Sequence, residues 1–299
     1  MMTSLGTPQR PGSFSGQRIL RVLATLLAFS LLASAPAMAQ DLRVMTFNVR
    51  LPVESDGANR WEARAELMAE AVKRENPDLI GTQELFKQQG DDLVARLPQY
   101  AWFGRGRRGG GDNDEHMGVF YRKDRLRVLA SGDFWLSDTP EAVGSITWGN
   151  LYPRMATWAR FQRIADGATF FFYNTHLPYR EEDEPVRERG AALILSRLQQ
   201  LPVDEPVILA GDFNTDPGSR THSLLTVSLS DAWTSAARRK GPAATFHNFT
   251  GKADHRIDWI LYRGLQARSA RTITTHRGDR YPSDHFPVVA DFELRPPAK

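Results

Sequence analysis

Strand-like apolar runs recur along most of the chain, with few helical segments between them. Helical spacing predicts helices at 61–75, 186–200 and 221–225. Alternating or continuous apolar runs predict strands at 41–49, 79–82, 119–122, 157–164, 169–174, 207–210, 257–262 and 288–294. A hairpin turn at Asp166-Gly167 joins the strands 157–164 and 169–174. Many antiparallel strands with a few helices predict an α/β fold in which packed sheets are flanked by helices.

The first 39 residues have the pattern of an export signal. Arg10, Arg18 and Arg21 form a positive segment, residues 22–33 an apolar run, and residues 37–39 (Ala-Met-Ala) a small-x-small cleavage site. The apolar run is shorter than the roughly 20 residues that span a bilayer. We therefore expect a signal peptide at 1–39, a domain at 40–299, and a secreted or periplasmic product without a stable membrane anchor. The alternative is an uncleaved anchor.

Composition excludes several classes of protein. A hydrophobic fraction of 41 % and a charged fraction of 24 % exclude a disordered or collagen-like chain. The absence of cysteine excludes a disulfide framework, a cysteine-ligated metal and a thiol nucleophile. Outside the predicted signal peptide, basic and acidic side chains balance at 35 each, so bulk charge indicates no particular partner.

Polar side chains suited to catalysis lie at the ends of the predicted strands: Asn48, Glu84, Asn174, His176, Asp212, Asn214, Asp258, Asp284 and His285. Each alone is typical of a turn, a helix cap or a hydrogen-bonded scaffold residue. Their repetition favours a functional site, because loops at strand ends are where rigid scaffolds present chemistry.

Six short motifs carry a resemblance to a known family: TFNVR (46–50), PDLIGTQE (77–84), NTHL (174–177), GDFN (211–214), HRIDWI (255–260) and SDHFPV (283–288). In this order they resemble the endonuclease/exonuclease/phosphatase superfamily, which includes deoxyribonucleases, abasic-site endonucleases, sphingomyelinases and inositol-polyphosphate phosphatases. The resemblance implies a four-layer α/β sandwich of two mainly antiparallel sheets flanked by helices. It also implies a metal-dependent phosphoric ester hydrolase.

The resemblance implies a magnesium or manganese site. Glu84 is then the principal ligand, Asn48 contributes its amide oxygen, and Asp284 is a further ligand. A set of oxygen ligands favours magnesium or manganese, which are hard cations, over zinc. The alternative for Glu84 is a structural salt bridge. Arg50 stands where abasic-site endonucleases place an acidic residue, which argues against a second ligand on this strand and against DNA repair.

The resemblance also assigns catalytic roles. Asp212 orients or deprotonates the attacking water, and Asn214 holds a phosphate oxygen. His285 contacts the phosphate, while Asp258 fixes its tautomer through the other ring nitrogen. His176 is the second imidazole, and the sequence leaves open which histidine is the general acid.

Three further residues are expected to support the site. Asn174 lies on the same strand as His176. Glu115 is expected to orient His176, the alternative being an exposed loop carboxylate. Arg154 is either a cation facing the phosphate or a charge at a strand edge.

The substrate is left open. We expect a monomer that hydrolyses a phosphate ester, with a phosphodiester favoured and nuclease activity compatible with the family. The basic residues Arg105, Arg107 and Arg108 lie in a glycine-rich stretch that predicts a mobile, solvated loop. The first alternative is an enzyme of the same fold acting on a phospholipid or a sugar phosphate. The second is a non-catalytic binding module, although Glu84, Asp212, Asp258 and His285 are all retained.

Overall fold

The computed structural model describes residues 1–9, 12 and 41–295. The chain divides into two units after Met38, and every helix and strand given below belongs to the second unit, Ala39–Lys299. The predicted signal peptide, residues 1–39, lies outside the described residues except for 1–9 and 12. Among the described residues, no helix combines the length and the apolar character needed to cross a membrane.

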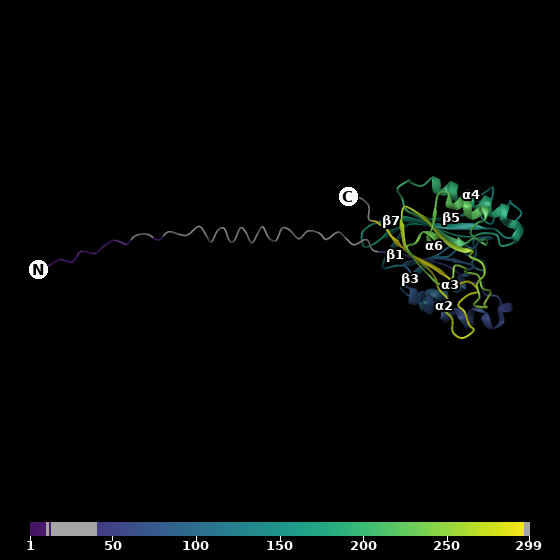
Figure 1. Ribbon diagram of the computed structural model, residues 1–299, viewed down its shortest axis with the longest axis horizontal. Coiled ribbons are helices and arrows are strands. Elements are labelled where there is room, and N and C mark those ends of the chain that lie inside the picture. The colour runs from purple at the N-terminus through teal and green to yellow at the C-terminus, as the bar shows by residue number, and fades with distance from the viewer. Residues whose placement is uncertain (10–11, 13–40, 296–299) are drawn as a thin grey trace. The chain divides into compact units, whose positions relative to one another are not determined.

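The domain is built on two mixed β-sheets (Figure 1). The seven-stranded sheet has the order β10 (Arg238–Lys240), β12 (Gln266–Thr272), β13 (Val288–Glu293), β1 (Asp41–Asn48), β2 (Leu79–Gln83), β4 (Val119–Arg122) and β3 (Tyr100–Phe103). The six-stranded sheet has the order β5 (Leu126–Trp135), β6 (Met155–Arg163), β7 (Thr169–His176), β8 (Val207–Asp212), β11 (Asp258–Arg263) and β9 (Ser230–Asp231). Neighbouring strands are antiparallel except in the pairs β1–β2, β7–β8 and β10–β12.

Helices cover the outer faces of both sheets, so that α2 and α3 lie on one side of the domain in Figure 1 and α4 on the other. The longer helices are α2 (Trp61–Glu75), α3 (Lys87–Arg96), α4 (Glu184–Gln199) and α5 (Arg220–Thr226). Shorter elements are α6 (Ala232–Ser235), η1 (Glu54–Asn59) and η2 (Glu181–Asp183). The predicted four-layer α/β sandwich is confirmed.

Alternation along β7 shows how the layers are held together. Phe170 and Phe172 belong to the core between the two sheets, whereas Phe171 and Tyr173 belong to the core beneath α4. Successive side chains of a strand point to opposite faces, so a strand buried on both faces reads as a continuous apolar run. This is why the run FFFY predicts a strand correctly.

A polar contact joins the two sheets beneath the strand ends. The Asn174 amide nitrogen donates to the carbonyls of Thr82 (2.8 Å) and Gly118 (3.0 Å), and Gln83 Nε2 donates to Asn174 Oδ1 (2.7 Å). A Cβ at Gly81 would lie 2.8 Å from Asn174 Oδ1, so this close approach requires glycine. Asn174 therefore supports the strand ends from below.

Candidate active site

A cavity of about 1110 Å³ opens at the ends of strands from both sheets. Most of the predicted site residues line it: Glu84, Glu115, Arg154, His176, Asp212, Asn214, Asp284 and His285. Asn48, Asn174 and Asp258 are buried and do not line it. The fold therefore brings residues from distant parts of the sequence to one concave site, the usual form of a catalytic centre.

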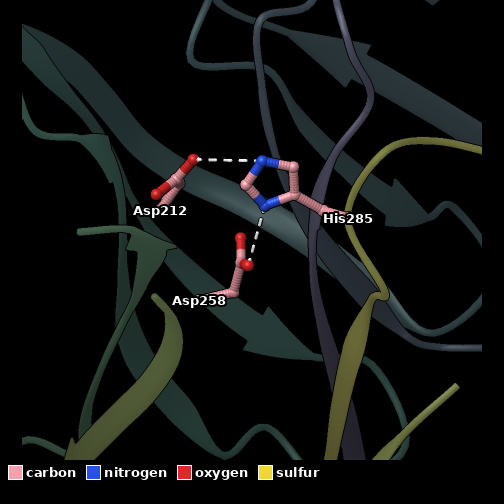
Figure 2. Close-up of side chains that lie close together, drawn as sticks. All are labelled: Asp212, Asp258 and His285. Atoms are coloured by element: carbon pink, nitrogen blue, oxygen red, sulfur yellow. Dashed lines mark hydrogen bonds and ion pairs between the residues drawn. The ribbon is translucent and has the colours of Figure 1, made fainter. Parts of the chain in front are cut away.

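His285 lies between two carboxylates (Figure 2). Its Nδ1 is 2.9 Å from Asp258 Oδ2, and its Nε2 is 3.8 Å from Asp212 Oδ2. The antiparallel register of β8 and β11 sets Asp212 directly opposite Asp258. Because Asp258 occupies Nδ1, the other ring nitrogen is the one turned toward Asp212 and the cavity.

The combined effect of burial and nearby charge raises the pKa values of both Asp212 and His285. Burial lowers the pKa of His285, but the charge of Asp258 and its hydrogen bond outweigh burial and raise the pKa to about 10. Burial, followed by the charge of Asp258, raises the pKa of Asp212 to about 7. The cationic imidazole of His285 thus faces the Asp212 carboxylate, whose pKa is close to neutral pH.

His176 approaches Asp212 from the adjacent strand. The parallel register of β7 and β8 pairs the two residues, and His176 Nε2 lies 3.5 Å from Asp212 Oδ2. Burial, then the charges of Arg154 and Arg107, lower the pKa of His176 well below its usual value. His176 is therefore a neutral imidazole, in contrast to His285.

The structure corrects the expected role of Glu115. Its carboxylate pairs with Arg107 (Nη2–Oε1 2.5 Å) and not with His176, whose Nδ1 has no partner among the described residues. The loop folds back so that the amide of Arg107 donates to the Glu115 carbonyl (3.0 Å), which brings the two side chains together.

Arg107 itself departs from the solvated loop that its composition predicts, although Arg105 and Arg108 beside it are exposed. Arg107 is only 3 % exposed, and Trp135 Nε1 donates to its carbonyl (2.6 Å). Sequence reasoning missed Arg107 and Arg108 as cavity residues, since charge alone does not distinguish them from Arg105, which does not line the cavity.

Arg154 is not a charge at a strand edge. It is 4 % exposed, lines the cavity, and donates to the His176 carbonyl at 3.5 Å. Burial, then the charge of Arg107, lowers its pKa to about 10. A buried guanidinium beside His176 is suited to facing an anion.

Asn214 and Asp212 are joined at the turn that follows β8. The backbone of Asn214 has φ 52°, and its N–H donates to Asp212 Oδ1 (3.0 Å). The side-chain amide of Asn214 donates to the Leu177 carbonyl (3.0 Å). Asn214 lines the cavity and also fixes the Asp212 carboxylate.

Glu84 and Asn48 meet at the ends of β1 and β2, but the amide of Asn48 is turned differently from expectation. Asn48 Nδ2 donates to Glu84 Oε1 (3.1 Å) and to Asp212 Oδ2 (2.9 Å). Its oxygen accepts from the backbone N–H of Arg50 (2.9 Å). Two carboxylates attract the donor end of the amide, so Asn48 presents its oxygen to a metal only after a half-turn of the amide group.

The donor set fits a hard divalent cation. Glu84 and Asp284 both line the cavity, and burial, with the charge of Glu84 adding to it, raises the pKa of Asp284. Carboxylate oxygens that line one cavity are the ligands that magnesium and manganese prefer. A second group that could hold a metal is Asp212, Asp258 and His285, whose ligand atoms lie within 4.8 Å of one another.

A match to a family model shows which protein family the chain belongs to. Residues 45–285 match the model of the endonuclease/exonuclease/phosphatase family. The chain belongs to this family. Its members hydrolyse phosphate esters.

Solved structures of the endonuclease/exonuclease/phosphatase family resemble the domain closely. A family protein from Bacteroides vulgatus has a TM-score of 0.81 at 33 % identity, over 86 % of this chain and 100 % of that one. A Bacteroides thetaiotaomicron mannosyl-6-phosphatase has a TM-score of 0.78 at 31 % identity, over 84 % and 99 % of the two chains.

More distant family members include the Drosophila melanogaster protein nocturnin, 22 % identical over 92 % of this chain. This chain covers 50 % of the length of that relative.

Proposed function

We propose that this protein is an exported, magnesium- or manganese-dependent hydrolase that cleaves a phosphate ester by in-line attack of water. The observation that carries the proposal is the position of Asp212 between two imidazoles of opposite character. His285, held by Asp258, is cationic, and His176 is neutral. A base and a charged donor in one cavity are what phosphoryl transfer to water requires.

Asp212 accepts the proton of the attacking water, because its raised pKa makes it a better base than an ordinary carboxylate at neutral pH. The Nδ1–H of His285 stays hydrogen-bonded to Asp258, and the Nε2–H of His285 donates its proton to a phosphate oxygen. The water oxygen bonds to phosphorus as the ester P–O bond breaks, and the leaving oxygen takes up a proton in place of the one that Asp212 removed from water. The products are an alcohol and inorganic phosphate from a monoester, or an alcohol and a phosphate monoester from a diester.

Among the described residues, two sets of side chains could hold the metal. Glu84 and Asp284 are better candidates than the set of Asp212, Asp258 and His285. Asp258 already shares a hydrogen bond with His285 and does not line the cavity. Asn48 would join Glu84 and Asp284 with its amide turned. A divalent cation held there supplies charge neutralisation for the phosphate and for the leaving oxygen.

Several features of the cavity favour a small substrate over a long polyanion. Its wall mixes carboxylates, among them Asp114, Glu181 and Asp216, with arginines, so it is not the uniformly basic surface that a nucleic acid backbone binds. Tyr179 is 53 % exposed and also lines the cavity, so it offers a flat apolar surface to a sugar or a base. The mannosyl-6-phosphatase among the similar structures makes sugar phosphates the first substrates to test.

The test is a substrate panel with p-nitrophenyl phosphate, bis-p-nitrophenyl phosphate, sugar phosphates, nucleotides, DNA, RNA, sphingomyelin and phosphatidylinositol. We expect hydrolysis of at least one small phosphate ester, its loss with EDTA and its return with Mg²⁺ or Mn²⁺. His285→Ala serves as the inactive control. Full activity in EDTA would contradict metal dependence, and inactivity on the whole panel would contradict the proposed function.

Export is proposed from the sequence of residues 1–39. Intact-mass analysis of the protein from the periplasm or the medium should give an N-terminus near Gln40. Retention of residues 1–39 in the mature protein would contradict this part of the proposal.

A further inference from the structure

Buried arginines in this domain fall into two kinds, distinguished by what their guanidinium nitrogens contact. In Arg64 every guanidinium nitrogen donates to a backbone carbonyl. In Arg187 every nitrogen donates to a carbonyl or to Glu184. These two side chains hold the fold together, because four of the five N–H donors of each guanidinium are paired within the protein.

Arg107 and Arg154 differ from this pattern. Arg107 donates through Nη2 to Glu115, while its Nε and Nη1 are buried without a partner among the described residues. The guanidinium of Arg154 makes a single hydrogen bond within the described part of the chain, the long one to the His176 carbonyl. Unpaired donors on buried cations are costly, and their presence in a cavity wall indicates a missing anionic partner.

The two guanidiniums act on one region of the cavity. Both line it, and both lower the pKa of His176 by their charge. Arg107 also lies over the ring of Tyr152, 5.1 Å from its centroid, which holds the side chain in place. Glu115 forms an ion pair with Arg107, whereas Arg154 has no ion-pair partner among the described residues.

We propose that Arg107 and Arg154 bind the terminal oxygens of a dianionic phosphate, which makes the substrate a phosphate monoester. This inference rests on the proposed function and names its substrate class. A monoester presents three terminal oxygens and nearly two negative charges at neutral pH, whereas a diester presents two oxygens and one charge. Two guanidiniums supply planar sets of donors for the additional oxygen and charge. This proposal differs from the phosphodiester that sequence reasoning favours.

The kinetic test compares p-nitrophenyl phosphate with bis-p-nitrophenyl phosphate under identical metal conditions. The wild-type protein should have the higher kcat/KM on the monoester. Arg107→Lys and Arg154→Lys should lower the monoester value by about 10- to 100-fold, the usual effect of losing a charged hydrogen bond, and affect the diester much less. Arg105→Lys is the matched control, because Arg105 is exposed on the same loop and does not line the cavity.

Arg107→Lys keeps a cation beside Glu115. If this variant does not fold, the double variant Arg107→Met/Glu115→Gln removes both charges together and replaces it. Circular dichroism and the melting temperature report folding for each protein before kinetics are measured.

A binding experiment in EDTA separates this inference from the proposed function. Inorganic phosphate should bind to the wild-type protein by calorimetry, dimethyl phosphate should not, and both lysine variants should lose the binding. Equal loss of monoester and diester hydrolysis in the variants, or phosphate binding that survives them, would overturn the inference while leaving the hydrolase intact. Phosphate binding without hydrolysis of either ester would instead overturn the proposed function alone.

Discussion

Two Asp–His pairs in this domain have almost the same hydrogen-bond distance and opposite surroundings. Asp258 Oδ2 lies 2.9 Å from His285 Nδ1 at the cavity, and Asp231 Oδ2 lies 3.0 Å from His222 Nε2 next to α5. Asp231 also receives both terminal nitrogens of Arg256 (2.7 and 3.2 Å) and the amide of Trp233 (2.8 Å). Asp258 Oδ1, by contrast, is buried with no partner among the described residues.

The surroundings decide what each pair can do. Hydrogen bonds and the charge of Arg256 outweigh burial and lower the pKa of Asp231 to about 2, so that carboxylate is a fixed anion. In the other pair a second carboxylate, Asp212, faces the same imidazole and has its pKa raised to about 7. A saturated pair stabilises the fold, and an unsaturated pair beside a cavity remains available for proton transfer.

The largest expected difference between the two pairs is in turnover. His285→Ala and Asp258→Asn should each lower kcat on a phosphate ester by at least about 10²-fold, because each removes or misdirects the charged donor. Asp231→Asn should leave kcat within about 3-fold of the wild-type value, since Asp231 does not line the cavity. Steady-state kinetics at saturating metal checks both, and an inactive Asp231→Asn protein with a normal melting temperature would contradict the comparison.

Asp212→Asn sharpens the comparison by separating activity from stability. It should lower kcat by about 10²-fold or more with little change in KM, since the lost group acts on the reacting water. Its melting temperature at pH 8 should equal or exceed that of the wild type, because a carboxylate that is costly to bury becomes a neutral amide. Thermal unfolding next to kinetics gives both values. A large fall in melting temperature would assign Asp212 to the scaffold.

For stability, the larger effect is expected in the Asp231–His222 pair. Asp231→Asn should lower the free energy of unfolding at pH 7 by about 2 kcal/mol, the value of a pKa held near 2 instead of 3.8. A lowered folded-state pKa stabilises the fold above the unfolded value, and this stabilisation is lost as pH falls through the folded value. Urea denaturation should therefore show the variant and the wild type converging between about pH 4 and pH 2. A difference that persists at pH 2 would show that the charge of Asp231 is not the cause.

A third Asp–His pair should give the smallest effect on stability. His255 Nδ1 lies 2.6 Å from Asp216 Oδ2, but both side chains are about half exposed. Solvent screens such pairs, so His255→Ala should change the free energy of unfolding by no more than about 0.5 kcal/mol. Urea denaturation at pH 6 checks this. A loss comparable to that of Asp231→Asn would show that hydrogen-bond length, and not surroundings, sets the strength of these pairs.

Sequence reasoning predicts the fold best where strands are buried on both faces. Strands β7 and β8 are continuous apolar runs, and α2 is predicted with its observed bounds. It misses β5, an edge strand whose middle is largely exposed, and α3, which begins with a polar run and buries few apolar side chains. Half-solvated elements leave a weak hydrophobic pattern.

The site is predictable to a similar extent. Residues at strand ends converge because the sheets align those ends, so the positions of Asp212 and His285 follow from the motifs. The partner of Glu115, the orientation of the Asn48 amide and the burial of Arg107 depend on how a loop folds back over the domain. Charge and composition carry no information about such long-range contacts.

The central claim is that Asp258 acts through His285. A double-mutant cycle on kcat with Asp258→Asn, His285→Ala and the combined variant tests it most directly, with one phosphate ester and saturating metal. If the two residues act as a unit, the double variant should be within about 3-fold of the slower single variant. If instead the two losses multiply, Asp258 and His285 contribute independently, and the pairing that distinguishes this site from Asp231–His222 has no catalytic role.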